Sequence, residues 1–227
     1  MSVTDKLPRL VILISGSGSN LQSFIDACRQ KDSTGKLAAQ IAAVISNKPD
    51  VKGLTRASEA NIPNIVVDHR AFDSRDAFDA NLADVIDSFA PDLVVLAGFM
   101  RILTPQFVNR FVGRLINIHP SLLPAYPGLH THRRAIEAGD AEAGATVHFV
   151  TPELDGGPAI LQARVPVLAD DDANSLAQRV LAVEHKIYPI AAQWFCSGRL
   201  IMRDGRAVLD NQPLGDSGKI FAQGGER

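Results

Sequence analysis

The sequence contains little cysteine: Cys28 and Cys196 are the only two among 227 residues. Two distant cysteines form neither a disulfide framework nor a zinc-binding set, and both lie in apolar helical patterns typical of packed free thiols. The histidines show no metal-binding spacing such as H-E-x-x-H. We therefore expect a fold that is stable without disulfides, and a site without a metal.

Long apolar runs and a strong net charge are also missing. Residues 1–8 lack the apolar region of a signal peptide, and no apolar run is long enough to span a bilayer. The formal net charge is -2, and the basic residues are dispersed along the chain. These features predict a cytoplasmic protein that binds neither membranes nor nucleic acid.

The hydrophobic pattern, by contrast, is strong. Hydrophobic residues make up 46% of the chain, enough for one large α/β domain. Continuous apolar runs, typical of strands buried on both faces, alternate with amphipathic segments up to residue 118. The predicted strands are residues 9–15, 41–46, 65–68, 93–98 and 115–118, and the predicted helices are 21–29, 52–60, 73–89 and 105–111. This order predicts a Rossmann-like, doubly wound, mostly parallel sheet with helices on both faces.

Beyond residue 127 the pattern changes and predicts an antiparallel C-terminal extension. The expected elements are a helix over 132–138, paired antiparallel strands over 144–149 and 160–167, a helix over 174–194 and a hairpin over 199–202 and 207–209. Tyr188-Pro189 marks an expected break or kink in the long helix. Residues 1–210 are expected to form a single domain, followed by a flexible tail over 211–227.

The most informative segment is Asn-Ile-His-Pro-Ser-Leu-Leu-Pro at residues 117–124. Residues i and i+2 of a strand share a face, so Asn117 and His119 should point into one cleft while Ile116 and Ile118 point into the core. An imidazole exchanges a proton near neutral pH, and a carboxamide donates to a developing oxyanion without titrating. The pair therefore suits acyl or formyl transfer through a tetrahedral intermediate, although a lone histidine is more often structural.

A Gly-Ser-Gly-Ser-Asn segment at residues 16–20 joins the first predicted strand to its helix. Glycine permits close approach to a ligand, and the free N–H groups of a helix start attract an anion. Leu21 departs from the dinucleotide-binding spacing, and no P-loop lysine follows, so a single phosphate monoester fits best. The alternative is a plain tight turn with Asn20 as helix cap. Its place at the same sheet edge as residues 98–101 and 117–119 favours the ligand.

Two carboxylates are weaker candidates. Asp155 lies in a Leu-Asp-Gly-Gly turn signal, but the tip of this loop could fold over the cleft and bring a carboxylate to His119. Glu184 either lies on a solvated helix face or accepts hydrogen bonds from sugar hydroxyls. His148, inside a predicted strand, is as readily structural as functional, and residues 130–132 place two more histidines in a loop.

Together these motifs closely resemble those of the glycinamide ribonucleotide transformylase family, the folate-dependent phosphoribosylglycinamide formyltransferases of purine synthesis. The resemblance extends from Leu10 to Leu209. Its motifs are Ile-Ser-Gly-Ser-Gly-Ser-Asn-Leu at 14–21, Ala-Gly-Phe-Met-Arg-Ile-Leu at 97–103, residues 117–124 with Tyr-Pro-Gly at 126–128, and His-Phe-Val at 148–150 leading to Asp-Gly-Gly at 155–157. It implies the formyltransferase fold and metal-free transfer of a formyl group from 10-formyltetrahydrofolate to the amine of glycinamide ribonucleotide.

The resemblance also implies roles for individual residues. Asn117 and protonated His119 would stabilise the oxyanion, and a water held by Asp155 would help to move the proton. The implied ribonucleotide-binding residues are Gly18, Ser19 and Asn20 for the phosphate and Glu184 for the ribose. The implied folate-binding residues are Arg75, Met100, Arg101, Ile102, Leu103, Val150 and Leu154. Some family members carry a lysine one turn before the glutamate, where this chain has Leu181, so phosphate binding would depend on backbone N–H groups and neutral side chains.

Other functions make different demands on the chain. A formyltetrahydrofolate hydrolase carries an N-terminal regulatory domain, and a methionyl-tRNA formyltransferase carries a large C-terminal one. We expect neither, since the first strand begins near Leu10 and only a short segment follows Leu209. A non-catalytic phosphate- or nucleotide-binding module would not need Asn117, His119 and Asp155 together. We therefore expect a transferase of small molecules, acting as a monomer or homodimer.

Overall fold

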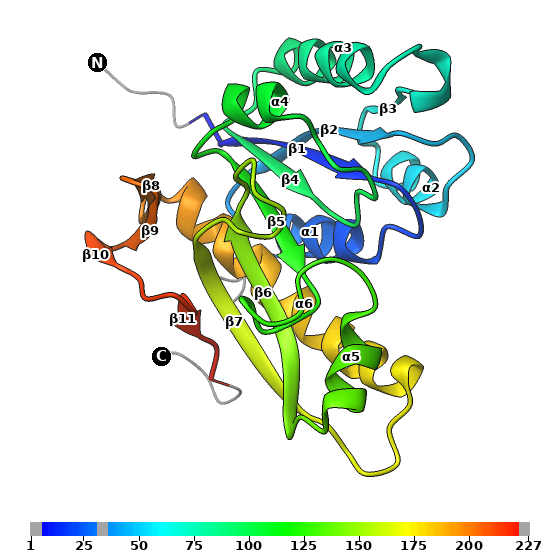
Figure 1. Ribbon diagram of the computed structural model, residues 1–227. Coiled ribbons are helices and arrows are strands. Elements are labelled where there is room, and N and C mark those ends of the chain that lie inside the picture. The colour runs from blue at the N-terminus through cyan, green and yellow to red at the C-terminus, as the bar shows by residue number, and fades with distance from the viewer. Residues whose placement is uncertain (1–5, 31–35, 223–227) are drawn as a thin grey trace.

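The computed structural model describes residues 6–30 and 36–222. Its main feature is an eight-stranded sheet in the order β11-β7-β6-β5-β4-β1-β2-β3 (Figure 1). The strands are β1 (Arg9–Ile14), β2 (Gln40–Ser46), β3 (Asn64–Val66), β4 (Leu93–Leu96), β5 (Leu115–His119), β6 (Glu142–Phe149), β7 (Ala159–Pro166) and β11 (Lys219–Ile220). The first five are parallel, and β6 and β7 join them antiparallel. The predicted mostly parallel sheet with an antiparallel extension is confirmed.

The chain starts in the middle of this sheet and winds outwards in both directions. From β1 it runs through β2 to β3 on one side, then returns to β4 and β5 on the other. The strand order therefore reverses between β1 and β4. In open α/β sheets, ligands bind beyond the carboxyl ends of the strands at such a reversal.

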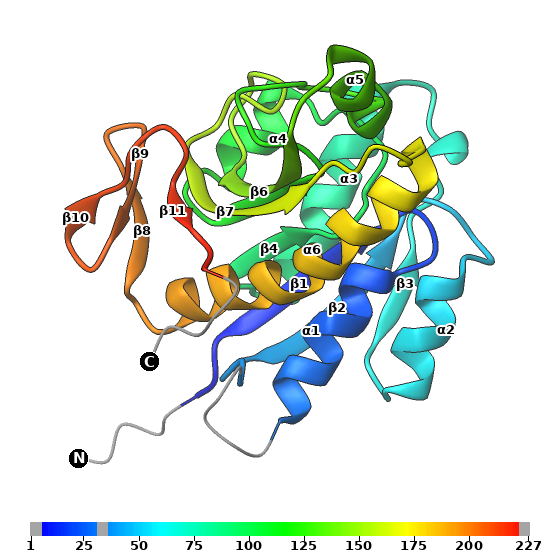
Figure 2. The ribbon, with the colours of Figure 1, turned by 90° about the horizontal axis from the view of Figure 1, so that it is seen from below.

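Helices cover both faces of the sheet (Figures 1 and 2). One core cluster joins the sheet to α1 (Ser19–Arg29) and α6 (Ala173–Cys196), and the other joins it to α3 (Arg75–Ser88) and α4 (Pro105–Arg110). Leu10 and Ile12 belong to the first cluster, whereas Val11 and Leu13 belong to the second. Because successive side chains of a strand point to opposite faces, a strand covered on both sides must be apolar throughout.

Two shorter helices lie at the margins of the sheet. The helix α2 (Lys52–Glu59) contacts β2 and β3, and α5 (Thr131–Ala138) contacts α6 and β6. A 3₁₀ turn, η1 (His69–Ala71), follows β3 and was not expected from the pattern. It begins where the Asp68 carboxylate accepts a hydrogen bond from the Arg70 backbone N–H at 3.0 Å, a local cap that hydrophobic periodicity does not report.

The predicted helix over 174–194 is confirmed, and it has no break at Tyr188-Pro189. The helix α6 begins at a capping box formed by Asp172 and Ser175 and remains helical through Pro189 to Cys196. Proline removes one backbone hydrogen bond and strains the preceding turn. Here the apolar face of α6 is buried on both sides of Pro189, for example at Val180 and Ala192, and that burial outweighs the local cost.

The segment after the long helix is more structured than expected. The expected hairpin is present as β8 (Leu200–Arg203) and β9 (Arg206–Leu209), and β10 (Gln212–Pro213) adds a third strand. The strand β11 then pairs with β7, and the Phe221 N–H donates to the Gln162 carbonyl at 2.7 Å. An edge strand offers unpaired backbone groups, which a polar, Gly-rich segment can satisfy without a strong hydrophobic signal. The end of the expected tail, residues 223–227, lies outside the described residues.

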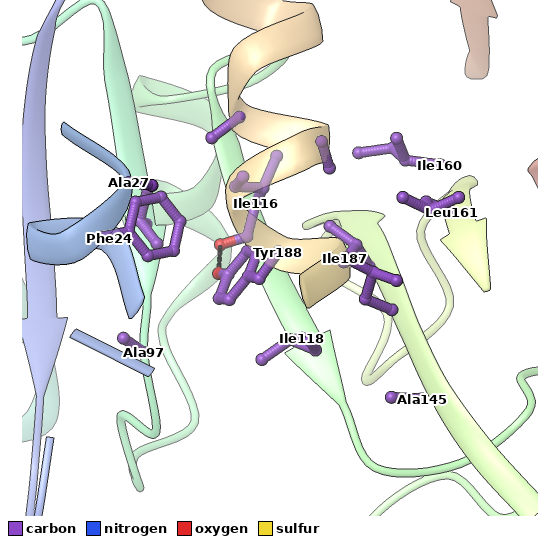
Figure 3. Close-up of a cluster of buried hydrophobic side chains, with 14 of the residues drawn as sticks. Phe24, Ala27, Ala97, Ile116, Ile118, Ala145, Ile160, Leu161, Ile187 and Tyr188 are labelled. Atoms are coloured by element: carbon purple, nitrogen blue, oxygen red, sulfur yellow. Dashed lines mark hydrogen bonds between the residues drawn. The ribbon is translucent and has the colours of Figure 1, made fainter. Parts of the chain in front are cut away.

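One face of β5 packs into the core, and the other face carries candidate site residues. Ile116 and Ile118 are 0% and 8% exposed and pack beside Tyr188 and Ile187 of α6 (Figure 3), as expected from the alternation. Asn117 and His119 therefore point to the opposite face of the sheet. Within the two described ranges, the structure contains no helix long and apolar enough to cross a membrane.

Candidate functional site

A cleft of about 600 Å³ opens beyond the carboxyl ends of β4 and β5. Its walls come from the segment after β4, the end of β5, the loop before α5 and the loop after β6. The lining residues include 98–103, 117–120, 128–132, His148 and 150–155. Segments far apart in the sequence therefore meet in one cavity. It lies at the sheet edge that the positions of the motifs predicted.

The amide of Asn117 is held in one orientation by His148. These residues face each other across the β5–β6 pair, with Asn117 Nδ2 3.2 Å from His148 Nε2. His148 Nδ1 lies 2.9 Å from the Phe149 carbonyl, so Nδ1 carries the proton and Nε2 accepts from Asn117. Burial lowers the pKa of His148 to about 4, which keeps the ring neutral near pH 7. One Nδ2 hydrogen of Asn117 is thus committed to His148, and the second remains for a ligand.

The ring of His119 is held between two oxygen acceptors. Its Nε2 lies 2.9 Å from the Tyr126 carbonyl, and its Nδ1 lies 3.5 Å from Asp155 Oδ2. The side chains of His119 and Asp155 are only 8% and 10% exposed. Nε2 therefore donates to the Tyr126 carbonyl, whereas Nδ1 faces the Asp155 carboxylate at ion-pair distance without a short hydrogen bond.

Asp155 reaches this position from a strained loop. Its backbone adopts φ 51°, a left-handed conformation in which aspartate is one of the more tolerated residues. Its Oδ2 also accepts from the Gly128 N–H at 2.8 Å, and its Oδ1 lies 3.9 Å from His148 Nε2. One carboxylate thus joins the loop after β6 to the loop before α5 and lies at ion-pair distance from His119. The turn signal in the sequence predicted the loop that carries Asp155. The contact between Asp155 and His119 could be seen only in the tertiary structure.

The wider part of the cleft is mostly apolar. Of the residues implied for folate binding, Met100, Arg101, Ile102, Leu103, Val150 and Leu154 line it, whereas Arg75, exposed at the start of α3, does not. Met100, Ile102 and Leu154 are 71%, 61% and 56% exposed, and Leu129 on the facing loop is 71% exposed. Large apolar side chains exposed around one cavity indicate a site for an apolar ligand.

The loop after β4 is anchored to the end of β1 by Ser15. The Ser15 hydroxyl accepts from the Met100 N–H at 2.8 Å and donates to Asn47 Oδ1 at 2.6 Å. Next along this loop, the Arg101 guanidinium lies 4.9 Å from the centre of the Phe78 ring. Its Nε is buried and has no hydrogen-bond partner among the described residues, so Arg101 retains donor capacity at the cleft.

The Gly-Ser loop lies at the start of α1. Gly18 has φ 69°, and a Cβ there would lie 2.7 Å from the Cα of Gly53, so only glycine fits. Ser19 lines a second cleft, of about 580 Å³, together with Arg56 and His185. In the part of the chain that the structure describes, no side chain caps α1, which leaves its first N–H groups available to an anion.

The side chain of Asn20 contacts Glu184 instead of capping the helix. Asn20 Nδ2 donates to Glu184 Oε2 at 2.8 Å, and both residues are 7% exposed. Burial raises the pKa of Glu184 to about 7, while the hydrogen bond from Asn20 acts in the opposite direction. The solvated-face interpretation of Glu184 is thereby excluded. The Asn20 Oδ1 atom is buried and finds no partner among residues 6–30 and 36–222.

Sequence reasoning underestimated His148 and did not single out Ser15. A polar residue inside an otherwise apolar strand was the available signal for His148, but its register opposite Asn117 followed only from strand pairing. The sequence predicted that Ser15 ends the first strand, but it did not indicate which groups the Ser15 hydroxyl would bond. As for metals, no group of three or more His, Cys, Asp or Glu side chains could hold an ion within the described ranges.

Comparisons with known proteins agree with this geometry. Residues 8–192 match the family model described as formyl transferase. The chain is 56% identical over 209 residues to the phosphoribosylglycinamide formyltransferase of Escherichia coli strain K12, covering 92% of this chain and 97% of that protein. It is 49% identical to the phosphoribosylglycinamide formyltransferase of Haemophilus influenzae, covering 93% and 98%. A solved phosphoribosylglycinamide formyltransferase from Coxiella burnetii superposes with a TM-score of 0.90 at 47% identity, covering 96% and 100%. The chain belongs to the formyl transferase family.

Proposed function

We propose that this protein transfers the formyl group of 10-formyltetrahydrofolate to the primary amine of glycinamide ribonucleotide, giving formylglycinamide ribonucleotide and tetrahydrofolate in purine synthesis. Family membership and the printed names of the similar proteins support the reaction. The observation that carries it is the meeting of Asn117, His119 and Asp155 in one cleft, with donors and a carboxylate a few ångströms apart.

Asn117 and His119 are the proposed oxyanion donors. Attack of an amine on a formyl carbon develops negative charge on the formyl oxygen, which oriented donors in a water-poor cleft stabilise. The second Nδ2 hydrogen of Asn117 and the Nδ1–H of His119 serve this purpose, because the 3.5 Å between Nδ1 and Asp155 Oδ2 leaves this N–H without a short hydrogen bond. His148 fixes the amide and the Tyr126 carbonyl fixes the ring, so neither donor must reorient during the reaction.

His119 and Asp155 are the proposed proton carriers. The attacking amine must lose a proton, and the leaving nitrogen of the folate must gain one. In this proposal His119 gives its proton to the leaving nitrogen, and a water held by the Asp155 carboxylate passes the proton of the amine to His119, so that both groups return to their starting states. The 3.5 Å separation between His119 Nδ1 and Asp155 Oδ2 allows the carboxylate to stabilise the imidazolium form of His119.

The apolar part of the cleft suits the flat ring system of a folate. 10-Formyltetrahydrofolate supplies the formyl carbon when bound. Exposed Met100, Ile102 and Leu154 would cover its apolar faces, and backbone groups of the two loops would meet its polar edges. The unpartnered Nε of Arg101 makes Arg101 the better-supported of the two candidate arginines for the anionic end of the folate.

The ribonucleotide would bind between α1 and α6. The N–H groups of Gly18, Ser19 and Asn20 would hold its phosphate, and Glu184 would accept from its ribose hydroxyls. The catalytic unit in this proposal is a single domain over residues 1–210. It acts in the cytoplasm on small molecules, as a monomer or homodimer and without a metal.

The direct test mixes the purified protein with both substrates and measures folate product, with one control lacking the ribonucleotide. The His119→Ala variant is expected to lose about 100-fold or more of the turnover, as expected for loss of a general acid–base group. His69→Ala is the matched control, since His69 also contacts a backbone carbonyl, that of Asn47 at 2.8 Å, but lies outside both clefts. Product without ribonucleotide would indicate a hydrolase, and no product at all would favour a phosphate-binding module.

A further inference from the structure

The hydroxyl group of Tyr188 is buried in an apolar part of the core. The residue is 0% exposed, and its ring lies edge-on to Phe24 with the centroids 5.0 Å apart. Its neighbours in the cluster include Ile116, Ile118 and Ile187 (Figure 3). A phenylalanine would fill nearly the same space, and a buried hydroxyl is unfavourable unless it is hydrogen-bonded. The hydroxyl therefore requires a specific explanation.

The hydroxyl bridges two neighbouring strands. Its oxygen lies 3.0 Å from the Leu96 carbonyl and 3.1 Å from the Ile116 carbonyl. A tyrosine has one hydroxyl proton, so both carbonyls share one donor, and each carbonyl has two lone pairs with which to accept it. Leu96 is the last residue of β4, and Ile116 of β5 directly precedes Asn117. The bridge thus lies next to the ends of these strands, where Asn117 and the residues after Leu96 line the cleft.

The same face of α6 also carries Glu184. Residues four apart on a helix lie one above the other, so Glu184 and Tyr188 both face the sheet side of α6. Glu184 is joined to Asn20 of α1, and Tyr188 to β4 and β5. One helix therefore carries a carboxylate proposed for ribose binding and a hydroxyl that is hydrogen-bonded to the strand bearing Asn117.

We propose that Tyr188 is a positioning residue for formyl transfer: its hydroxyl fixes β5 against α6 and so sets the distance between Asn117 and a ribonucleotide held at Glu184. This inference rests on the proposed function. Tyr188 touches neither substrate and acts only through Asn117. Small displacements of a catalytic group, on the order of 1 Å, can lower a rate by about 100-fold, so a buried hydroxyl far from the ligands can affect turnover.

The Tyr188→Phe variant removes only the hydroxyl oxygen. We expect its kcat to fall about 10-fold while both KM values stay within about twofold, because the donor moves but the binding groups remain. Ile187→Val is the matched control: Ile187 is the adjacent residue of α6, is also 0% exposed, and loses a methyl group without losing a hydrogen bond. A general loosening of the core would slow both variants alike, and that result would overturn the proposal.

A double-mutant cycle with Asn117→Ala separates positioning from a structural role. If Tyr188 acts through Asn117, Tyr188→Phe should slow the Asn117→Ala enzyme less than about twofold. If the same tenfold loss appeared in both backgrounds, Tyr188 would not be acting through Asn117. Wild-type turnover is measured in the same series, so absence of the proposed activity is recognised separately.

A second measurement does not depend on activity. The side-chain NH₂ signals of Asn117, assigned by their loss in Asn117→Ala, can be followed in ¹⁵N–¹H NMR spectra of the full-length protein. We expect these signals to shift in Tyr188→Phe and to stay in place in Ile187→Val. Unshifted signals in a folded Tyr188→Phe variant would refute the positioning role even if the protein catalysed a different reaction.

Discussion

Replacing Glu184 with glutamine should change how the stability of this protein depends on pH. Glu184 is 7% exposed, and burial raises its pKa from an ordinary value of 4.5 to about 7. Below pH 4.5 the carboxyl is protonated in both the folded and the unfolded chain. Between the two values the unfolded chain releases the proton while the folded chain retains it, so stability is lost as the pH rises. Above the folded-state pKa the loss is complete.

The size of this effect follows from the shift. One pKa unit corresponds to about 1.4 kcal/mol, so a rise from 4.5 to about 7 corresponds to roughly 3 kcal/mol of unfolding free energy. Glutamine has no proton to release, and its amide can still accept from Asn20 Nδ2. The free energy of unfolding of Glu184→Gln minus that of the parent should therefore increase by roughly 2–3 kcal/mol between about pH 5 and pH 8.

Urea unfolding of both proteins at several pH values measures this difference. With a typical urea dependence of about 1–3 kcal/mol per molar, the midpoints should separate by roughly 1 M more at the higher pH. Subtracting the parent removes the contribution of every other titrating group that the substitution leaves unchanged. Glu59→Gln, at an exposed position of α2, is the control and should show a separation that hardly varies with pH.

A pH-independent difference between Glu184→Gln and the parent would refute the reasoning. It would mean that the Glu184 carboxyl ionises equally readily in the folded and unfolded states, and hence that it is hydrated in solution. The same result would remove the physical basis for treating Glu184 as a buried acceptor held by Asn20. If the parent became more stable relative to Glu184→Gln as the pH rises, the pKa of Glu184 would be lowered in the folded state rather than raised.

Two further substitutions test the supports of the cleft. His148→Phe removes the acceptor that orients Asn117. In steady-state kinetics we expect kcat to fall about 10- to 100-fold with little change in the ribonucleotide KM. An unchanged kcat would show that Asn117 needs no such partner. Ser15→Ala leaves the Met100 N–H unpaired, and the loss of roughly 1 kcal/mol should raise the KM for the formyl donor about fivefold while that for the ribonucleotide stays constant. Equal changes in both KM values would argue against a local role for Ser15.

Local patterns predicted the framework of the site. The apolar run over residues 9–15 predicted a strand buried on both faces, because only a strand covered on both faces is apolar throughout, and the structure has β1 there. Alternation placed Ile116 and Ile118 inward, and the structure confirms both. The helix over 174–194 was predicted, but its continuity through Pro189 and the strand β11 were not, because long-range packing and edge pairing, rather than local propensity, decide them.

The contacts within the site depend on residues distant in the sequence. Asn20 and Glu184 are 164 positions apart, and Tyr188 lies 92 and 72 positions from the carbonyls that it bridges. No spacing rule relates such residues, and the environment that raises the pKa of Glu184 or lowers that of His148 exists only after α6 and β6 pack against the sheet.

The sequence by itself determined the mostly parallel α/β architecture, the edge of the sheet at which the candidate site lies, and the residues available there. These follow from periodicity and from motifs that act within a few residues, where backbone geometry dictates direction. Only the tertiary structure decided which partner each of these residues has: His148 for Asn117, Asp155 for His119, and Asn20 for Glu184. Hydrogen bonds and burial are properties of neighbours in space, and chain folding alone selects those neighbours.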